Sequence, residues 1–383
     1  MSKLLHVQVL RALAALSVAM LHAQFDAGVV AQRTTGGFRP SEMFPWAAGV
    51  DVFFVISGFI MVHASGRLFG TRGGRRIFLA HRVARVVPLY WAVTTLYVAV
   101  ALAVPALINR GELTPGYVLA SYLFIPIEGP DGHVLPLYGL GWTLNYEMFF
   151  YGLFALALGL RRSLAVSAVT VALLVLVAAG RVVPLPQPLA FWTDPILLEF
   201  AFGMALALAR EHGVRLGRAT ALALAAVALA LLAIDLGRAD APLWLPRVLA
   251  YGVPAALLVA AAALRPGGEA RPGPLTRLAV AVGDASYALY LLHPFVIRAG
   301  REAMLAGGLA VVVGPWAFVA FALVLASAAA LVVHRVFERP LTAWTRRRLE
   351  GAGASLSDRS AVDYADVGAG SPAPPDTDTR ASP

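Results

Sequence analysis

The chain has 383 residues, of which 59% are hydrophobic and 14% are charged, and its mean hydropathy is +0.73. This composition excludes a soluble globular domain and indicates a membrane protein. The absence of cysteine excludes disulfides and a cysteine nucleophile, and the net charge of +9 comes from arginines between apolar segments, which disfavours nucleic-acid binding.

Apolar stretches of about 20 residues, the length that crosses a bilayer as a helix, recur along the chain. They predict an all-α, polytopic integral membrane protein with about ten transmembrane helices. The stretches lie near residues 5–25, 45–65, 86–107, 140–160, 164–181, 191–209, 219–236, 243–264, 279–299 and 310–334. A shorter apolar segment, 117–127, contains Pro126, and we expect it to lie at the interface or to re-enter the membrane inside protein.

Lysine and arginine are distributed unequally between the two sets of loops. Alternate loops hold 20 of these residues on one side of the predicted membrane and 8 on the other. Because Lys and Arg accumulate in cytoplasmic loops, we expect a multi-pass protein of the cytoplasmic (inner) membrane with both termini in the cytoplasm. The transmembrane domain is expected over 1–349, and the Gly, Ser, Pro, Asp and Thr of 350–383 predict a disordered cytoplasmic tail.

The first predicted span contains two ionisable residues, Arg11 and His22. Such groups are costly at membrane depth and indicate a functional site. At about 100° per residue the two positions differ by only about 20° around a helix and by roughly 16 Å along it. We therefore expect them to face one cavity from different depths. A snorkelling arginine with an interfacial histidine would explain the same residues.

The second predicted span carries an acid near its outer end and two small residues deeper in the membrane. Asp51, at the same end as His22, is expected to orient the imidazole and to stabilise its protonated form. Ser57 and Gly58 stand among aromatic residues, and a small pair of this kind favours close helix packing over catalysis.

A cationic segment follows the second span and contains Arg75, Arg76, Arg82 and Arg85. If it is helical, Arg75, Arg82 and Arg85 lie within a face about 80° wide and would meet a polyanion that arrives from the cytoplasm. Contact with anionic lipid explains the charge equally well.

Three later polar residues stand in apolar surroundings. Glu147, in the fourth span, is costly unless it faces a polar cavity or pairs with an arginine, and Glu199 raises the same question in the sixth. His293 lies in an apolar run, where a structural, hydrogen-bonded histidine is as compatible with the sequence as a catalytic one.

These segments resemble the acyltransferase-3 family of membrane O-acyltransferases, and within it the branch that modifies exopolysaccharides. The similarity covers approximately residues 5–341. The matching elements, in the family's order, are Arg11 with His22, residues 49–59, 78–91, 142–151 with the glutamate at 147, 286–294, and Phe337-Glu338-Arg339-Pro340. The resemblance implies transfer of an acyl group, usually acetyl, from acyl-CoA to a hydroxyl of a carbohydrate or related molecule, with Arg11 and His22 as the essential residues.

A general-base mechanism follows from this expectation. A neutral histidine, whose ordinary pKa is about 6.5, can take the proton of an attacking alcohol at physiological pH, and we assign this role to His22. The predicted catalytic residues are His22, Arg11, Glu147 and Asp51. The predicted donor-binding residues are Arg75, Arg76, Arg82 and Arg85, together with Arg11. The predicted acceptor-binding or oxyanion-binding residues are Trp142, Asn145, Tyr146, Ser286 and His293.

Acyl-CoA (acetyl-CoA) is expected as a donor substrate, with no metal and no permanently bound cofactor. The expected partners are membrane lipid and a carbohydrate or lipid-linked sugar acceptor, although a secondary metabolite such as a macrolide also fits. A transporter or exporter would also place charged residues at membrane depth, but the repeated halves typical of such folds are not detectable. A scaffold or receptor would leave His22, Asp51 and Glu147 as costly groups without a role. The oligomeric state stays open.

Overall fold

A computed structural model describes residues 4–34, 36–103, 113–235, 245–266 and 272–350 of the chain. These residues form helices joined by turns and loops, with no strand among them. The prediction of an all-α chain is therefore confirmed. The predicted tail lies outside the described residues, apart from Glu350 at its first position.

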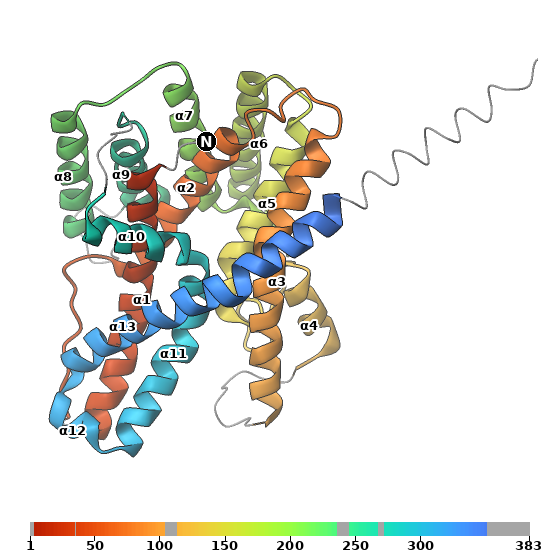
Figure 1. The fold of residues 1–383 in the computed structure, drawn as a ribbon. Helices are drawn as coiled ribbons and strands as arrows, with labels where there is room; N and C mark the ends of the chain where they lie inside the picture. The colour runs from red at the N-terminus through yellow and green to blue at the C-terminus, as the bar shows by residue number, and fades with distance from the viewer. Residues whose placement is uncertain (1–3, 35, 104–112, 236–244, 267–271, 351–383) are drawn as a thin grey trace, which may run out of the picture.

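Figure 1 shows an elongated helical bundle. Its α-helices are α1 (Leu5–Arg33), α2 (Gly49–Ala64), α3 (Gly74–Ala103), α4 (Pro115–Tyr122), α5 (Trp142–Ala157), α6 (Arg162–Val182), α7 (Leu198–Glu211), α8 (Arg218–Ile234), α9 (Val253–Ala263), α10 (Pro274–Asp284), α11 (Ser286–Ala306), α12 (Leu309–Val313) and α13 (Pro315–Val333). Short 3-10 helices precede α2 (η1, Trp46–Ala48), α5 (η3, Gly139–Gly141) and α7 (η4, Phe191–Thr193, and η5, Pro195–Leu197). One π-helix, η6 (Val248–Gly252), leads into α9, and another, η7 (His334–Glu338), follows α13.

Five helices in the described part of the chain are long and apolar enough to cross a bilayer. They are Leu5–Arg33, Trp46–Ala64, Gly74–Ala103, Arg162–Val182 and Pro315–Glu350. The pair α10 and α11, bent by 78°, gives a sixth span if it counts as one. Each of the ten predicted stretches contains helix, but breaks such as the one between α10 and α11 divide several of them. Ten crossings and cytoplasmic termini therefore stay predictions.

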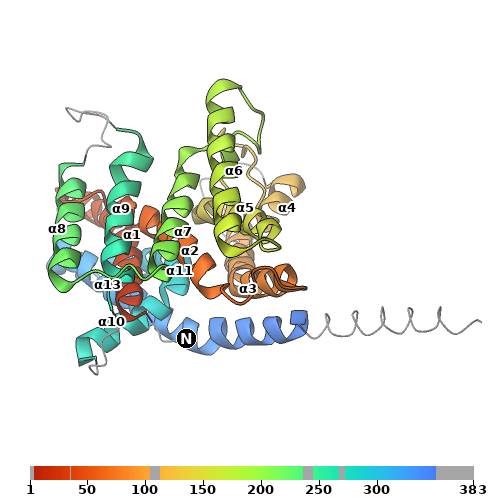
Figure 2. The same cartoon turned by 90° about the horizontal axis from the view of Figure 1, so that it is seen from above.

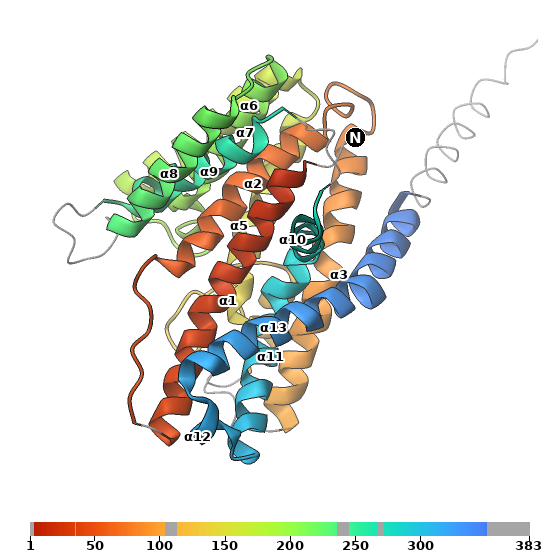
Figure 3. The ribbon, with the colours of Figure 1, turned by 60° about the vertical axis from the view of Figure 1, so that its left-hand side comes forward.

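Helix α1 lies inside the bundle and packs against α2, α10, α11 and α13 (Figure 3). Helices α2 and α7 also approach each other closely, because glycines replace side chains where they meet. A Cβ on Gly58 would collide with the carbonyl oxygen of Phe200, and one on Gly203 would collide with that of Val55. The predicted packing role of Gly58 is confirmed.

The C-terminal helix runs obliquely along one side of the bundle and reaches α3 (Figures 1 and 2). It continues from α13 through η7 to Glu350 over 36 residues. Arg85 Nη1 lies 3.0 Å from Glu338 Oε1, and His81 Nε2 lies 2.7 Å from Glu350 Oε1. These two contacts attach the helix to the cationic segment of α3.

Candidate functional site

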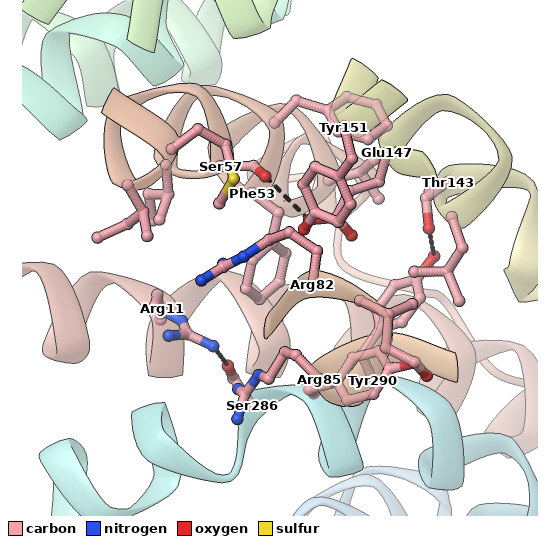
Figure 4. A pocket seen from close by; sticks show the side chains of 18 residues that line it. Arg11, Phe53, Ser57, Arg82, Arg85, Thr143, Glu147, Tyr151, Ser286 and Tyr290 are labelled. Carbon is pink, nitrogen blue, oxygen red and sulfur yellow. Dashed lines mark hydrogen bonds between the residues drawn. The ribbon is translucent and has the colours of Figure 1, made fainter. Parts of the chain in front are cut away.

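A cavity of about 140 Å³ lies between α1, α2, α3, α5 and α11 (Figure 4). Apolar side chains, mainly from α2, line part of its wall. The polar groups that line it are Arg11, Ser57, Arg82, Arg85, Thr143, Glu147, Tyr151, Ser286, Tyr287 and Tyr290. The cavity therefore gathers polar residues from five helices that are far apart in sequence, in a chain where such residues are rare.

Three guanidinium groups gather on one side of this cavity (Figure 4). Arg11 donates a hydrogen bond of 2.9 Å to Ser286 Oγ, which fixes its direction. Arg85 is held by the buried Glu338. Arg82 lies over the Phe78 ring, and its buried Nε has no hydrogen-bond partner among the described residues. Because three cations meet here and one has an unused donor, this side of the cavity suits an anion with several oxygens.

The carboxylate of Glu147 lies on another side of the cavity and is held by two hydroxyl groups. Ser57 Oγ donates a hydrogen bond of 2.9 Å to Glu147 Oε1, and the Tyr151 hydroxyl donates to the same atom. Within the described ranges Glu147 forms no ion pair with an arginine. The two hydroxyl groups, and not a structural Glu–Arg pair, therefore hold its carboxylate. The carboxylate is therefore fixed beside the cavity, with Oε2 free of these two bonds.

His22 lies beside His293, which α11 presents to α1. The His22 Nδ1 atom is 3.0 Å from the Val18 carbonyl oxygen and 3.3 Å from His293 Nε2. The two rings meet edge to face, with centroids 4.9 Å apart. His293 is fully buried, and its Nδ1 is 3.0 Å from the Leu289 carbonyl oxygen.

These contacts assign the tautomers of both histidines. A carbonyl oxygen only accepts hydrogen bonds, so each Nδ1 atom carries a hydrogen. His293 Nε2 is then an acceptor, and it lies where His22 Nδ1–H can donate to it. The remaining nitrogen, Nε2 of His22, keeps its lone pair. This arrangement suits a general base, because the basic nitrogen is defined before substrate arrives.

Arg11 lines the cavity and His22 does not, although both belong to α1. The expected shared cavity is thus seen only at its Arg11 end. Tyr290 connects the two sites: it lines the cavity, and its ring centroid is 6.3 Å from that of His293. Its hydroxyl donates to the Leu140 carbonyl oxygen and lies 3.0 Å from Thr143 Oγ1.

The prediction that Asp51 orients His22 is wrong. The fully buried Asp51 accepts hydrogen bonds from Arg247 Nε at 3.0 Å and Nη2 at 2.6 Å. The fully buried Glu199 shares this cluster. The reason is the direction of α2: Gly49, about 200° away around the helix, faces α1, so Asp51 faces η6 and α7 instead.

The predicted donor-binding arginines separate into two pairs. Arg82 and Arg85 line the cavity, whereas Arg75 and Arg76 are exposed on α3 outside it. The helix that carries them begins at Gly74, twelve residues or about three turns before the predicted span at 86, so all four belong to one continuous helix. Of its residues Arg82, Arg85 and Val86, all in its first half, line the cavity.

The predicted acceptor-binding residues also separate. Ser286 lines the cavity, and His293 contacts His22. Tyr146 instead stacks on Phe191, with centroids 4.1 Å apart. Trp142 lies edge to face with Phe54, which is itself a wall of the cavity. Asn145 is buried, and its amide has no hydrogen-bond partner in the part of the chain that the structure describes.

Tyr151, Tyr290 and Asp26 are not among the predicted site residues. Tyr151 follows Glu147 by four residues, a spacing that places both side chains on one face of a helix and could have indicated their contact. Asp26 lies one helical turn beyond His22 and pairs with Arg301 at a distance of 2.5 Å, where both side chains are buried. No local pattern indicates this pair, because α1 and α11 are distant in sequence.

Comparison with known proteins assigns this helical membrane protein to a class of enzymes. Residues 5–335 match the family described as "Acyltransferase domain", and the chain belongs to this family of O-acyltransferases. It is 39% identical over 321 residues to the exopolysaccharide production protein ExoZ of Rhizobium meliloti (strain 1021), covering 82% of this chain and 95% of that protein. It is 30% identical over 331 residues to the acyltransferase MdmB of Streptomyces mycarofaciens, covering 78% and 81%. No solved structure matches.

Proposed function

We propose that the enzyme transfers an acyl group, with acetyl as the expected one, from cytosolic acyl-CoA to a hydroxyl of a carbohydrate. An exopolysaccharide or its lipid-linked precursor is the expected acceptor, and the name of the Rhizobium relative, an exopolysaccharide production protein, supports this class. The proposed location is the inner membrane, with ten crossings and both termini in the cytoplasm. The observation that supports the proposal is a cavity lined by three arginines, whose wall residue Tyr290 has its ring centroid 6.3 Å from that of His293, the residue that contacts His22.

The donor would bind with its phosphates at the guanidinium side of the cavity. Arg82 has an unused buried donor there, and Arg11 is aimed by Ser286. The pantetheine arm would then extend along α1 toward His22, past Tyr290. A cavity of about 140 Å³ is smaller than this arm requires, so donor binding would open a path between Phe53 and Tyr290.

The chemical step follows from the tautomers. The acceptor oxygen attacks the thioester carbonyl carbon while its proton passes to His22 Nε2. The tetrahedral intermediate then collapses, the carbon–sulfur bond breaks, and the leaving thiolate takes the proton back from the imidazolium. CoA thiol and an ester are the products, with atoms and charge in balance. Holding both reactants in this geometry supplies several kcal/mol, on the order of 7 when orientation is good.

His293 would act as a positioning residue for this base. When His22 is protonated, its Nδ1–H keeps donating to His293 Nε2 and Val18, so the ring does not rotate between the two proton transfers. The Leu289 carbonyl fixes the His293 tautomer that makes this possible.

Replacing His293 with alanine is expected to lower kcat by about tenfold or more with little change in the acyl-CoA KM, because the base loses its orienting acceptor. The His293→Gln variant keeps an acceptor oxygen and should recover part of the rate. Steady-state kinetics of both variants measure this difference. Equal losses in the two variants, or a loss confined to KM, would show that His293 has only a packing role.

Replacing Arg82 with glutamine is expected to raise the KM for acyl-CoA by about 10- to 100-fold, the range for losing one hydrogen bond to a charged group. Arg72→Gln serves as the matched control, since Arg72 is exposed and lies outside the cavity. A KM that changes equally in both variants would show that the donor phosphates bind elsewhere.

The function itself is tested by mass spectrometry of cell-surface carbohydrate and small metabolites with and without this gene. The expected result is an added acyl mass on a carbohydrate that is lost on deletion and is not restored by His22→Ala. Uptake or efflux by purified protein in sealed vesicles, without consumption of acyl-CoA, would favour a transporter instead.

A further inference from the structure

A second cavity, of about 670 Å³, lies on the other side of α1 from the Arg11 cavity. Val9, Leu13 and Met20 of α1 line it and lie roughly opposite Arg11 around the helix. Helices α8 and α9, at one edge of the bundle, form the facing wall (Figures 1 and 2). The two cavities lie on opposite faces of α1 and also share α2, from which Gly49 and Val52 line this cavity and Val50 and Phe53 line the Arg11 cavity.

This cavity is a long apolar groove. Its α1 wall runs from His6 to Met20, which corresponds to roughly 21 Å at 1.5 Å per residue. Nearly all of its lining is aliphatic or aromatic, and the side chains at its edges are accessible from outside: Leu13 is 59% exposed and Leu222 is 58% exposed. A groove of this shape in a membrane protein opens sideways and suits an extended hydrocarbon chain.

One end of the groove is cationic. Arg265 lines it there and supplies the positive charge, and the His6 imidazole, which can donate a hydrogen bond, lines the same cavity. In the described part of the chain no ion pair holds the Arg265 guanidinium. Helix α1 also begins at this end, at Leu5, with no side-chain cap and no acidic residue in its first turn. A guanidinium, an imidazole and the N–H groups at a helix N-terminus together suit a phosphate group.

We propose that this groove binds one acyl chain of an anionic phospholipid, whose phosphate lies between His6, Arg265 and the N-terminus of α1. The length and apolar lining select a hydrocarbon chain, and the charge at one end selects an anionic headgroup. An apolar helix from another protein would not supply an anion for Arg265. The proposal does not depend on acyl transfer, because the groove lies on the opposite face of α1 from the proposed donor site.

The headgroup contact is tested with the purified full chain reconstituted in vesicles of equal parts phosphatidylglycerol and phosphatidylcholine. After mild extraction, the lipid retained per protein is counted by native mass spectrometry. Wild type is expected to retain phosphatidylglycerol in preference to phosphatidylcholine. The Arg265→Gln variant should lose this preference by about fivefold, the effect of one basic residue near an anionic lipid surface.

Arg277→Gln removes the same charge from an exposed position on α10 that does not line the groove. It should retain phosphatidylglycerol as wild type does. An equal loss in both variants, or a wild type with no preference, would overturn the proposal, since ordinary interfacial lipid would then account for the binding.

The chain contact is tested by filling the groove. Ala225 of α8 lines it, whereas Ala223 on the same helix is exposed and does not. Ala225→Trp is expected to remove the retained lipid, and Ala223→Trp is expected to keep it. Retention of phosphatidylglycerol by a folded Ala225→Trp variant would show that the acyl chain does not occupy this groove.

Discussion

Replacing His22 with alanine is expected to reduce acyl transfer by about 10²- to 10⁴-fold, the usual contribution of a general base. The variant keeps the cavity and its three guanidinium groups, so acyl-CoA should still bind. What it loses is the Nε2 lone pair, which the contacts to Val18 and His293 leave open in the native protein. The measurement is release of CoA thiol by purified protein in vesicles that contain acceptor.

Two controls separate catalysis from folding. The His22→Ala variant should insert into membranes and unfold at a temperature close to that of wild type, since His22 is only partly buried. His133→Ala, at an exposed loop position, should keep full activity. A folded His22→Ala protein with undiminished product formation would remove His22 from the mechanism.

Replacing Arg247 with alanine is expected to have the largest effect on stability, a loss of about 3 kcal/mol or more in the free energy of unfolding. The reason is that Asp51 and Glu199 are both fully buried and Arg247 is the cation that pairs with Asp51. Removing the arginine leaves Asp51 as an uncompensated buried charge; breaking a fully buried pair typically costs about 3–5 kcal/mol, and because Arg247 is 37% exposed the lower end of this range applies. Thermal unfolding in detergent measures the change.

The double variant Asp51→Asn with Arg247→Gln removes both charges and should recover much of this stability. Arg181→Ala, at an exposed position on α6, provides the comparison for loss of a single arginine. If Arg247→Ala and Arg181→Ala unfold at the same temperature, the Asp51 cluster does not hold α2 to η6.

The helices could be predicted from the sequence because their signal is local. A run of about 20 apolar residues identifies each stretch without reference to the rest of the chain. The breaks were not predicted: the bend of 78° between α10 and α11 lies at Gly283-Asp284-Ala285-Ser286, a short polar interruption inside the predicted span 279–299, and the direction of the bend depends on tertiary packing. The start of α3 at Gly74 was also missed, because the arginines before residue 86 interrupt the apolar run that identifies a span.

Part of the site also followed from local spacing. Helical periodicity predicted that Arg11 faces a cavity, and the cost of a carboxylate at membrane depth predicted a polar cavity at Glu147; both residues line the same cavity in the structure. The spacing of Arg11 and His22 along α1 does not reveal which side chain of another helix lies between them. Tyr290 of α11 lies there, between the cavity and the histidines, and the direction of Asp51 depended on where η6 and α7 lie.

The most direct test is a structure of the enzyme with a non-hydrolysable acyl-CoA analogue bound. Under the proposal, we expect the phosphates to lie at Arg11 and Arg82 and the Tyr290 ring to be displaced. We also expect room for an acceptor hydroxyl between the acyl group and His22, with the hydroxyl oxygen roughly 3–3.5 Å from the acyl carbonyl carbon and hydrogen-bonded to His22 Nε2. An analogue bound with its acyl end directed away from His22, or with Tyr290 and Phe53 still closed between them, would contradict it.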